Sequence, residues 1–348
     1  MKKKILVAPL NWGLGHATRC IPIIQDLIYT NFEPIIASDG VALDLLKKEF
    51  PQLSYFELPS YNIKYSKKSY LFKLRLLTDS PKVISAIQAE KKITKEIIES
   101  QDIAGIISDN RLGVYHKDIP SVFVTHQLQV LSGTTTWLSS KMHQKIINRF
   151  NECWVPDWDG EINLSGKLGH VNNTNLNIKY IGPISRFQKV ETDKKYDVMV
   201  LLSGPEPQRT MLEEKLLSAF EKYAGTLLFV RGVVEKEQSI LTKGNRTIYN
   251  FLIGKELEQA LNESNLIVSR SGYTTIMDLA KLKKKAFFIP TPGQFEQEYL
   301  AKRLTEKRLV PSCRQSEFTL DKLENTENYK GLEIFDDELN FNQLFNLF

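Results

Sequence analysis

The sequence is poor in cysteine, and its cysteines do not form the groupings that structural chemistry uses. Only Cys20, Cys153 and Cys313 occur in 348 residues, and they lie far apart. An odd and scattered set argues against a disulfide framework, and without a CxxC pair or a Cys/His cluster a structural zinc is not expected. We expect no metal and no cofactor.

Long hydrophobic runs are also missing. The start, MKKKILVAPLNWG, is basic and then apolar like a signal peptide, but its apolar run over residues 5–10 is too short and no small-residue cleavage site follows. No stretch has the length of a transmembrane helix. These features predict a cytoplasmic protein.

Charge of one sign is not in large excess. Lys and Arg number 46 against 41 Asp and Glu, and the net charge of +5 is too small to predict a nucleic-acid partner. The hydrophobic content of 42% and the charged content of 25% are ordinary for a globular protein. The length is enough for two domains.

Short apolar runs alternate with longer segments of helical periodicity in the first half of the chain. Expected strands cover 4–10, 33–38, 103–109 and 119–126, and expected helices cover 17–30 and 80–100. Nearly continuous apolar strands between helices predict a parallel sheet that is covered on both faces.

The same alternation restarts after a polar linker over residues 183–196. Expected strands cover 196–203, 225–232, 246–251, 266–270 and 286–290, with helices near 211–223, 254–263 and 274–283. We therefore predict an α/β fold with two tandem Rossmann-like, doubly wound domains, 1–185 and 186–335, that face a cleft. Residues 336–348 are expected to form a helix that docks back on the first domain.

The loop NWGLGHATRC follows the first expected strand. It is not a dinucleotide fingerprint, because Thr18 stands where G-x-G-x-x-G needs its third glycine. His16 is expected at a helix N-terminus, where the helix dipole disfavours its charged form and leaves a neutral imidazole able to accept a proton. The alternative is that His16 only caps the helix. Arg19 either steadies the loop or meets phosphate.

Two further strand ends carry polar residues. Asp109 and Asn110 follow one expected strand, and Thr125 and His126 follow the next. Because the carboxyl ends of parallel strands meet at one edge, we expect these side chains near His16, with Asp109 orienting the imidazole. The alternatives are that Asp109 and Asn110 cap turns and that His126 is a core residue.

The segment LIVSRSGYTTIMDLAKLKKKAFFIPTPGQFEQEYLA carries the strongest local signal. A strand ends at Arg270, a Ser271–Gly272 turn follows, and Thr274 or its neighbour can cap a helix whose N-terminus suits a diphosphate. Asp278 lies one turn into that helix, where a carboxylate can accept both ribose hydroxyls. Taken singly, these residues also fit a plain turn and a solvated helix.

As an ordered set the segment resembles the donor-nucleotide region of GT-B glycosyltransferases, nearest to the lipid II-forming N-acetylglucosaminyltransferases and the diacylglycerol galactosyltransferases. Arg270, Ser271 and Gly272 match the turn, and Asp278 stands where those families have a ribose-binding Glu. The family's Asp-Gln or Gln-Gln pair corresponds to Glu296–Gln297. Leu300–Ala301 replaces its Asn-Ala, without the asparagine.

The resemblance implies further contacts. Phe251 and Leu252 fall in the segment whose backbone reads uracil, and Ser203 and Gly204 fall in the second glycine-rich loop, which faces phosphate. Arg209 or Arg186 is the implied source of positive charge for the leaving group. Gly13 and Gly15 belong to the first loop, which faces the acceptor.

The resemblance implies an inverting, metal-independent transferase that moves sugar from a UDP-sugar to a saccharide or lipid-linked hydroxyl. The first loop is also similar to Gly-x-Gly-His-x-x-Arg-Cys of the UDP-sugar hydrolases of pseudaminic acid synthesis. The alternative is therefore a hydrolase in which His16 activates water, and a third reading is a UDP-sugar-binding regulator without activity.

Two other stretches have competing interpretations. Asp157 and Asp159 in VPDWDG form an Asp-x-Asp that we interpret as a turn, not a metal site. Residues 61–82 mix basic, aromatic and aliphatic side chains, which suits an anionic membrane surface or lipid-linked acceptor as well as a solvated loop. The first interpretation places the protein on the inner face of the cytoplasmic membrane.

Overall fold

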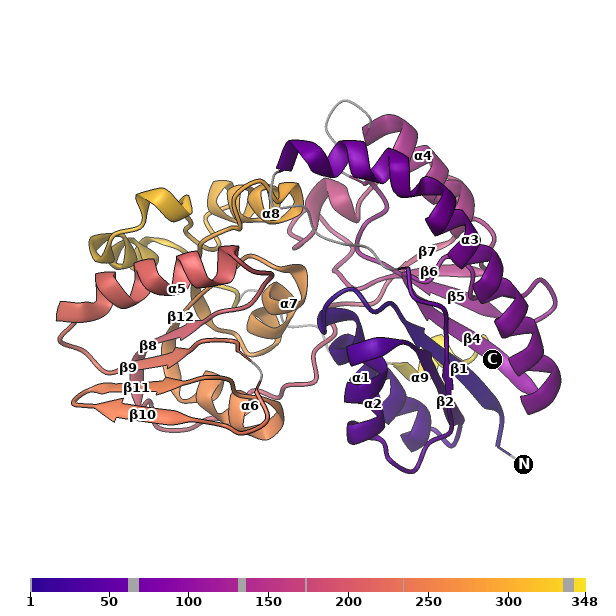
Figure 1. Cartoon of the computed structure of the whole chain (residues 1–348), viewed down its shortest axis with the longest axis horizontal. Helices are drawn as coiled ribbons and strands as arrows, with labels where there is room; N and C mark the ends of the chain where they lie inside the picture. Colours follow the sequence, from indigo (N-terminus) through magenta and orange to yellow (C-terminus); the bar gives the residue numbers. More distant parts are fainter. Residues whose placement is uncertain (1, 62–68, 131–135, 173, 234, 334–340) are drawn as a thin grey trace. The chain divides into compact units, whose positions relative to one another are not determined.

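The computed structural model describes residues 2–61, 69–130, 136–172, 174–233, 235–333 and 341–348, with the backbone alone for 69–83 and 342. The chain divides into two compact units (Figure 1). Unit 1 comprises Met1–Arg186 and Asp337–Phe348, and unit 2 comprises Phe187–Asp336. Each has its own sheet and its own hydrophobic core.

Unit 1 is built on a seven-stranded parallel sheet in the order β3-β2-β1-β4-β5-β6-β7. Its strands are β1 (Lys4–Pro9), β2 (Glu33–Ser38), β3 (Tyr55–Glu57), β4 (Ile103–Asp109), β5 (Ser121–Val124), β6 (Glu152–Val155) and β7 (Ile178–Tyr180). Its helices are α1 (Gly15–Tyr29), α2 (Gly40–Glu49), α3 (Ser69–Gln101), α4 (Thr136–Ile147) and α9 (Phe341–Phe345). This order of parallel strands is that of a Rossmann-like sheet.

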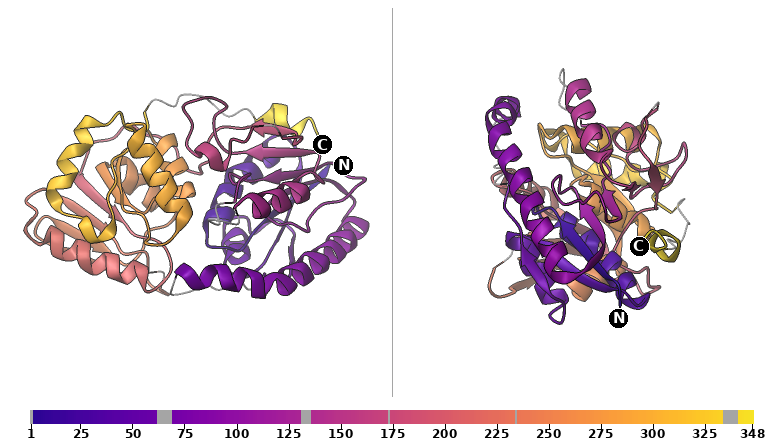
Figure 2. Two further views of the ribbon diagram at one scale, coloured as in Figure 1. Left: turned by 90° about the horizontal axis from the view of Figure 1, so that it is seen from above. Right: turned by 90° about the vertical axis from the view of Figure 1, so that its right-hand side faces the viewer.

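The period of two along β1 explains why both faces of this sheet are covered. Ile5 and Val7 point into a core formed with α1, α2 and α9, while Leu6 and Ala8 point into a second core that includes Ile97 of α3. Figure 2 shows α3 as the long purple helix that runs along unit 1. A strand buried on both faces needs apolar residues throughout, which is the pattern KILVAP.

The C-terminal segment packs on unit 1. The Phe345 ring lies 5.9 Å from Phe32 of the turn after α1 and 6.3 Å from Trp154 of β6. Lys3 Nζ donates to the main-chain oxygen of Phe348 at 2.6 Å. Aromatic burial and this contact fix residues 341–348 beside the N-terminal strand.

Unit 2 has a six-stranded sheet in the order β10-β11-β9-β8-β12-β13, parallel except for the β10–β11 hairpin. Its strands are β8 (Tyr196–Leu201), β9 (Leu227–Val230), β10 (Ile240–Lys243), β11 (Arg246–Tyr249), β12 (Ser264–Ser269) and β13 (Lys285–Phe288). Its α-helices are α5 (Gln208–Ala219), α6 (Gly254–Asn262), α7 (Tyr273–Lys281) and α8 (Phe295–Glu306). The predicted α/β fold with two Rossmann-like sheets is confirmed.

The segment 61–82 lies almost entirely outside the residues whose side chains are described. Tyr61 is the exception, and it is buried with its hydroxyl donating to Glu90 Oε2 at 2.6 Å. Of the helices that the structure describes, none combines the length and apolar character needed to span a bilayer.

Candidate active site

The loop between β1 and α1 places His16 at the start of a helix. Helix α1 begins at Gly15, so His16 is its second residue, close to main-chain N–H groups that have no intrahelical acceptor. Gly13 adopts a left-handed φ of +75° in a solvent-exposed position where an added Cβ would meet nothing. The loop thus needs glycine for its conformation, and the space around it stays open.

Asp109, the last residue of β4, reaches His16 across the edge of the sheet. Strands β1 and β4 are parallel neighbours with Pro9 opposite Asp109, so the two strand ends coincide. His16 Nδ1 lies 2.8 Å from Asp109 Oδ1. The carboxylate favours a proton on Nδ1, whereas Arg19 Nη2, which also lies 2.9 Å from Nδ1 and can only donate, favours a lone pair there. We assign the proton to Nδ1, which leaves Nε2 as the basic nitrogen.

Burial keeps this imidazole neutral. The His16 side chain is 15% exposed, and desolvation lowers its pKa below the ordinary value of 6.5, with Arg19 adding to the decrease and Asp109 opposing it. At neutral pH the ring is therefore uncharged. A neutral histidine held by a carboxylate is the arrangement that general-base catalysis requires.

Arg19 completes the cluster from one turn further along α1. Its guanidinium forms a two-pronged ion pair with Asp109 and also lies 2.9 Å from His16 Nδ1 and 3.3 Å from His126 Nδ1. Burial alone would raise the pKa of Asp109, but Arg19 and His16 hold it well below its usual range. Asp109 is therefore an anion at every pH of interest.

These contacts correct one prediction. Arg19 is only 2% exposed, and its guanidinium is engaged by Asp109 and two histidines, so it is not available to meet phosphate. Its role is to hold the carboxylate that holds His16. His126 follows β5 as expected and is buried against Arg19, whereas Asn110 has a left-handed φ of +57° and donates to Asp109 at 3.3 Å.

A second buried network behind the loop was not foreseen. The Arg111 guanidinium forms ion pairs with Glu90 of α3 at 2.8 Å and with Asp39 before α2, and it donates to Pro9 O at 2.9 Å. Asp39 in turn accepts from Asn11 of the loop at 3.0 Å. No sequence pattern links these residues, although Arg111 in DNRLG stands next to residues already singled out.

The candidate donor loops of unit 2 follow the carboxyl ends of adjacent parallel strands. Ser203 and Gly204 follow β8 and are exposed, with Gly204 at a left-handed φ of +106°. Gly272 follows β12 and caps α7 with extended backbone and without a side-chain cap, so the N–H groups of the first turn of α7, Thr274 included, have no intrahelical acceptor. The arrangement offers a concentration of N–H donors suited to an anion.

Several predicted side chains are instead used by the fold of unit 2. Arg270 is 1% exposed, burial lowers its pKa to about 10, and it donates to main-chain oxygens at Ile289, Pro290 and Gln208 and to Gln315. Arg209 forms ion pairs with Glu206 and Glu213. Both guanidinium groups thus have partners inside unit 2, although the buried Nε of Arg270 has none in the part of the chain that the structure describes, and the predicted substrate contacts of these two side chains stay predictions.

Ser271 and Gln297 tie two candidate loops together. The buried Ser271 hydroxyl donates to Gln297 O at 2.8 Å, and Gln297 Oε1 accepts from Thr291 N at 2.9 Å. The predicted substrate contact through the Ser271 hydroxyl is therefore replaced by a contact within the fold. The carboxamide of Gln297 fixes the loop after β13 through its oxygen.

For the remaining residues of the predicted donor site, the substrate contacts stay predictions. Phe251 and Leu252 follow β11 with largely buried side chains, so any base contact there is through the backbone. Asp278 is half-buried on α7, and Arg186 is half-buried at the end of unit 1. Glu296 is half-buried in the first turn of α8.

Asp157 has the structural role expected from the sequence. It is fully buried and accepts from the main-chain N–H groups of Trp158, Leu164 and Ser165, at 2.9, 2.8 and 2.7 Å. Across the described residues no group of three His, Cys, Asp or Glu side chains is arranged to hold a metal ion. Asp157 therefore organises the turn after β6.

Comparison with known proteins identifies the class. Residues 212–329 match the glycosyltransferase family 28 C-terminal domain. The chain is similar to the UDP-N-acetylglucosamine–N-acetylmuramyl-(pentapeptide) pyrophosphoryl-undecaprenol N-acetylglucosamine transferase of Clostridium tetani. The two sequences are 23% identical over 353 aligned residues, and the alignment covers 98% of this chain and 90% of that enzyme.

Solved structures agree on the fold. The glycotransferase of kitacinnamycin superposes with a TM-score of 0.67 at 12% identity, over 96% of this chain and 94% of that one. MurG of Acinetobacter baumannii gives 0.56 at 14% identity, over 94% and 92%. These relatives are transferases, so the hydrolase alternative gains no support from them. The chain is a glycosyltransferase of the GT-B fold, and residues 212–329 of its second unit match the family 28 C-terminal domain.

Proposed function

We propose that this glycosyltransferase is an inverting, metal-independent enzyme that transfers a sugar from a UDP-sugar to a hydroxyl of a saccharide or lipid-linked acceptor. The donor is UDP-N-acetylglucosamine or a UDP-hexose. The observation that carries the proposal is the neutral, carboxylate-held His16 beside the open glycine loop. The name of the Clostridium tetani relative, which states a UDP-sugar donor and an undecaprenol-linked acceptor, supports the choice of substrates.

The proposed chemistry divides between the units. In unit 1, His16 Nε2 takes the proton of the acceptor hydroxyl while its oxygen attacks the anomeric carbon and forms the new glycosidic bond. The bond from the anomeric carbon to the diphosphate breaks, and UDP leaves with the electron pair from the opposite face, so the configuration inverts. Asp109 stabilises the imidazolium that forms, and it stays ionised because Arg19 holds it.

Unit 2 is proposed to bind the donor. The N-terminus of α7 at Gly272 and Thr274, with Ser203 and Gly204 after β8, supplies donors that stabilise charge on the departing diphosphate. Backbone at Phe251 and Leu252 reads the uracil. Asp278 accepts from ribose hydroxyls, and Glu296 and Gln297 lie on the sugar side.

The resemblance implies Arg209 or Arg186 as the source of positive charge for the leaving group. In unit 2 the Arg209 guanidinium forms ion pairs with Glu206 and Glu213. Arg270 donates from Nη1 and Nη2 to partners in the same unit, while its buried Nε has no hydrogen-bond partner among the described residues. Within unit 2 the α7 N-terminus is the proposed source of stabilisation for the diphosphate. Arg186 of unit 1, which is half-buried, stays a predicted contact.

A lipid-linked acceptor also implies a subcellular location for the enzyme. We assign the enzyme to the cytoplasmic face of the membrane as a peripheral protein, with the basic and aromatic segment 61–82 as its contact with anionic lipid. Binding to vesicles that contain anionic lipid, and its loss at high salt, tests this part separately from catalysis.

The test of the function uses radiolabelled UDP-sugars with and without a bacterial membrane lipid extract. We expect label to pass into the lipid fraction with the wild-type chain, unchanged by EDTA, and not with His16→Ala. Release of free sugar at the same rate without lipid would establish the hydrolase instead. If no uridine nucleotide shifts the melting temperature, the donor assignment is wrong.

A further inference from the structure

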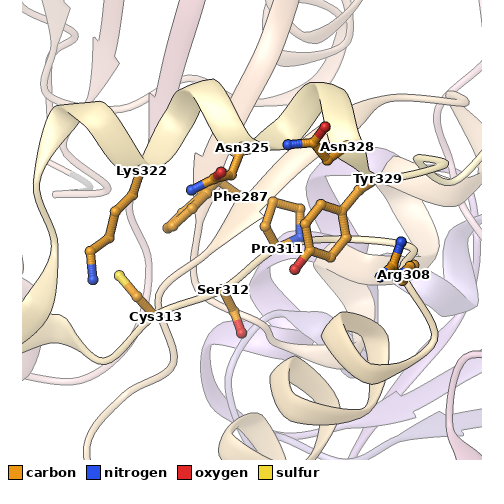
Figure 3. A pocket seen from close by; sticks show the side chains of 9 residues that line it. All are labelled: Phe287, Arg308, Pro311, Ser312, Cys313, Lys322, Asn325, Asn328 and Tyr329. Atoms are coloured by element: carbon orange, nitrogen blue, oxygen red, sulfur yellow. The ribbon is translucent and has the colours of Figure 1, made fainter.

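Unit 2 contains a cavity of about 640 Å³ at the edge of its sheet beyond β13, apart from every residue of the candidate site. Residues 308–313 after α8 form one wall, where Ser312 bridges to Phe288 of β13. The 3₁₀ helix η5 (Leu320–Asn328) forms the other wall. Its lining consists of Phe287, Arg308, Pro311, Ser312, Cys313, Lys322, Asn325, Asn328 and Tyr329 (Figure 3).

The charged side chains that line the cavity are both cationic, and Glu317, which acts on Cys313, lies outside the lining. It contains Arg308 and Lys322 and no carboxylate, and neither cation forms an ion pair with any residue that the structure describes. In Figure 3 Lys322 lies at one end, above Cys313, and Arg308 lies at the other, beside Tyr329. Two unneutralised cations at opposite ends of a cavity favour a ligand with an anionic group at each end.

A second cavity of unit 2 shows that this charge imbalance is not general. That cavity, of about 840 Å³, lies around Lys284 and is lined by both lysines and carboxylates. Lys285 on its wall forms an ion pair with Glu327 at 2.7 Å. Its charges are matched within the protein, and it gives no reason to expect an ion.

The remaining walls of the cationic cavity suit a hydroxylated body. Asn325 and Asn328 project carboxamides from η5 along one rim, and a carboxamide both donates to and accepts from hydroxyl groups. Phe287 and Pro311 are buried and give an apolar floor. The Ser312 hydroxyl bonds to Thr305 at 2.8 Å and belongs to the wall itself. A volume of this size holds a small organic ligand.

We propose that this cavity is a second ligand site that binds a phosphorylated sugar with a phosphate at each end. Arg308 pairs with one phosphate, for which its planar guanidinium is suited, and Lys322 pairs with the other. Asn325 and Asn328 bind the hydroxyls between them. The site is separate from the proposed donor loops and fits an effector, not a substrate.

Cys313 provides a local readout. It is half-buried in the cavity wall, whereas Cys20 and Cys153 are fully buried in unit 1, so a small alkylating reagent reaches Cys313 first. Burial raises the pKa of the Cys313 thiol to about 11, so its alkylation by iodoacetamide at about pH 8.5 is slow enough to follow by mass spectrometry. A ligand in the cavity slows it.

The experiment adds fructose 1,6-bisphosphate to the full chain, with and without UDP. We expect alkylation of Cys313 to slow at least about fivefold at saturation, with half-protection at a concentration about tenfold lower than for glucose 6-phosphate. UDP should change neither number. Because no donor-site residue is involved, this outcome is independent of the proposed function.

Variants separate a built site from general salt binding. Arg308→Gln and Asn328→Ala should each raise the half-protecting concentration about tenfold, while Arg314→Gln, an exposed arginine outside the cavity, should leave it unchanged. All are surface changes, and melting temperatures check their folding. The proposal is overturned if fructose 1,6-bisphosphate at about 20 mM does not protect Cys313 from alkylation. It is also overturned if inorganic phosphate protects Cys313 equally well, or if Arg308→Gln leaves the half-protecting concentration unaltered.

Discussion

The strand edges of the two units use their polar residues differently. In unit 1 the predicted side chains contact one another, and Asp109 forms a hydrogen bond with His16 and an ion pair with Arg19. In unit 2 the predicted arginines and Ser271 bind main-chain oxygens or carboxylates of their own unit. What remains accessible there is largely backbone, at Gly204 and Gly272.

The difference matches two chemical tasks. Proton transfer needs one titratable group with a fixed orientation and a tuned pKa, which a buried ion-pair cluster provides. Binding a diphosphate needs several N–H donors at fixed positions, which loops and a helix N-terminus provide without charged side chains. Unit 2 therefore uses its arginines to hold the loops in place.

Removing His16 should abolish the proton-transfer role that we assign to unit 1. We expect His16→Ala to lower the rate of sugar transfer about 10³-fold, because the acceptor hydroxyl loses its base. Binding of UDP, measured by calorimetry, should not change, because the donor loops belong to unit 2. The matched control is His116→Ala, away from the cluster, and equal losses in the two variants would refute the role of His16.

Removing Arg19 should damage the fold of unit 1 as well as catalysis. Arg19→Met leaves the buried Asp109 carboxylate without its guanidinium partner, at an expected cost of about 3–5 kcal/mol in the free energy of unfolding. All four tryptophans lie in unit 1, so tryptophan fluorescence in urea reports on this unit alone. Arg19→Met with Asp109→Leu should recover most of the stability but no activity, and recovery of both would contradict the account.

His143 on α4 should make unit 1 sensitive to acid. Burial against Phe123 lowers its pKa to about 4, from 6.5 in the unfolded chain. As the pH falls below 6.5 only the unfolded state takes up the proton, so about 3 kcal/mol of stability is lost by about pH 4. Fluorescence-monitored unfolding at about pH 5 should show a smaller loss for His143→Leu than for the wild type or His116→Gln.

The smallest effect is expected at the backbone-dominated edge of unit 2. Ser203→Ala removes one exposed hydroxyl and should weaken UDP binding by only about two- to fivefold, with no change in melting temperature. Calorimetry gives the affinity. A loss of 100-fold or more would mean that side chains, not backbone, dominate phosphate binding, and would remove the contrast between the units.

Much of the fold could be predicted because the strands are buried on both faces. EPIIAS and IAGIISD coincide with β2 and β4, and the expected helix at 17–30 overlaps α1 closely. Short elements were missed: β3 and β7 have three residues each, too few to show a period. Helix α3 begins at Ser69, well before the predicted start at residue 80.

The cluster around His16 could be predicted from strand ends, since parallel strands bring their carboxyl ends together. The roles of the arginines could not. Arg19, Arg209 and Arg270 look alike in sequence as sources of charge, and only their buried partners show that the fold uses them. The carboxylate partner of Arg19 and the partners of Arg270 lie far along the chain and leave no local pattern. The two glutamate partners of Arg209, in contrast, lie within four residues of it.

The central claim, that His16 is a neutral base with its proton on Nδ1, can be tested without any substrate. Two-bond ¹H–¹⁵N NMR of the chain labelled in its five histidines, with His16→Gln for assignment, reports the tautomer and the pKa of each ring. We predict that His16 carries its proton on Nδ1 at neutral pH and titrates below 6.5. A proton on Nε2, or a titration midpoint above 6.5, would contradict the account.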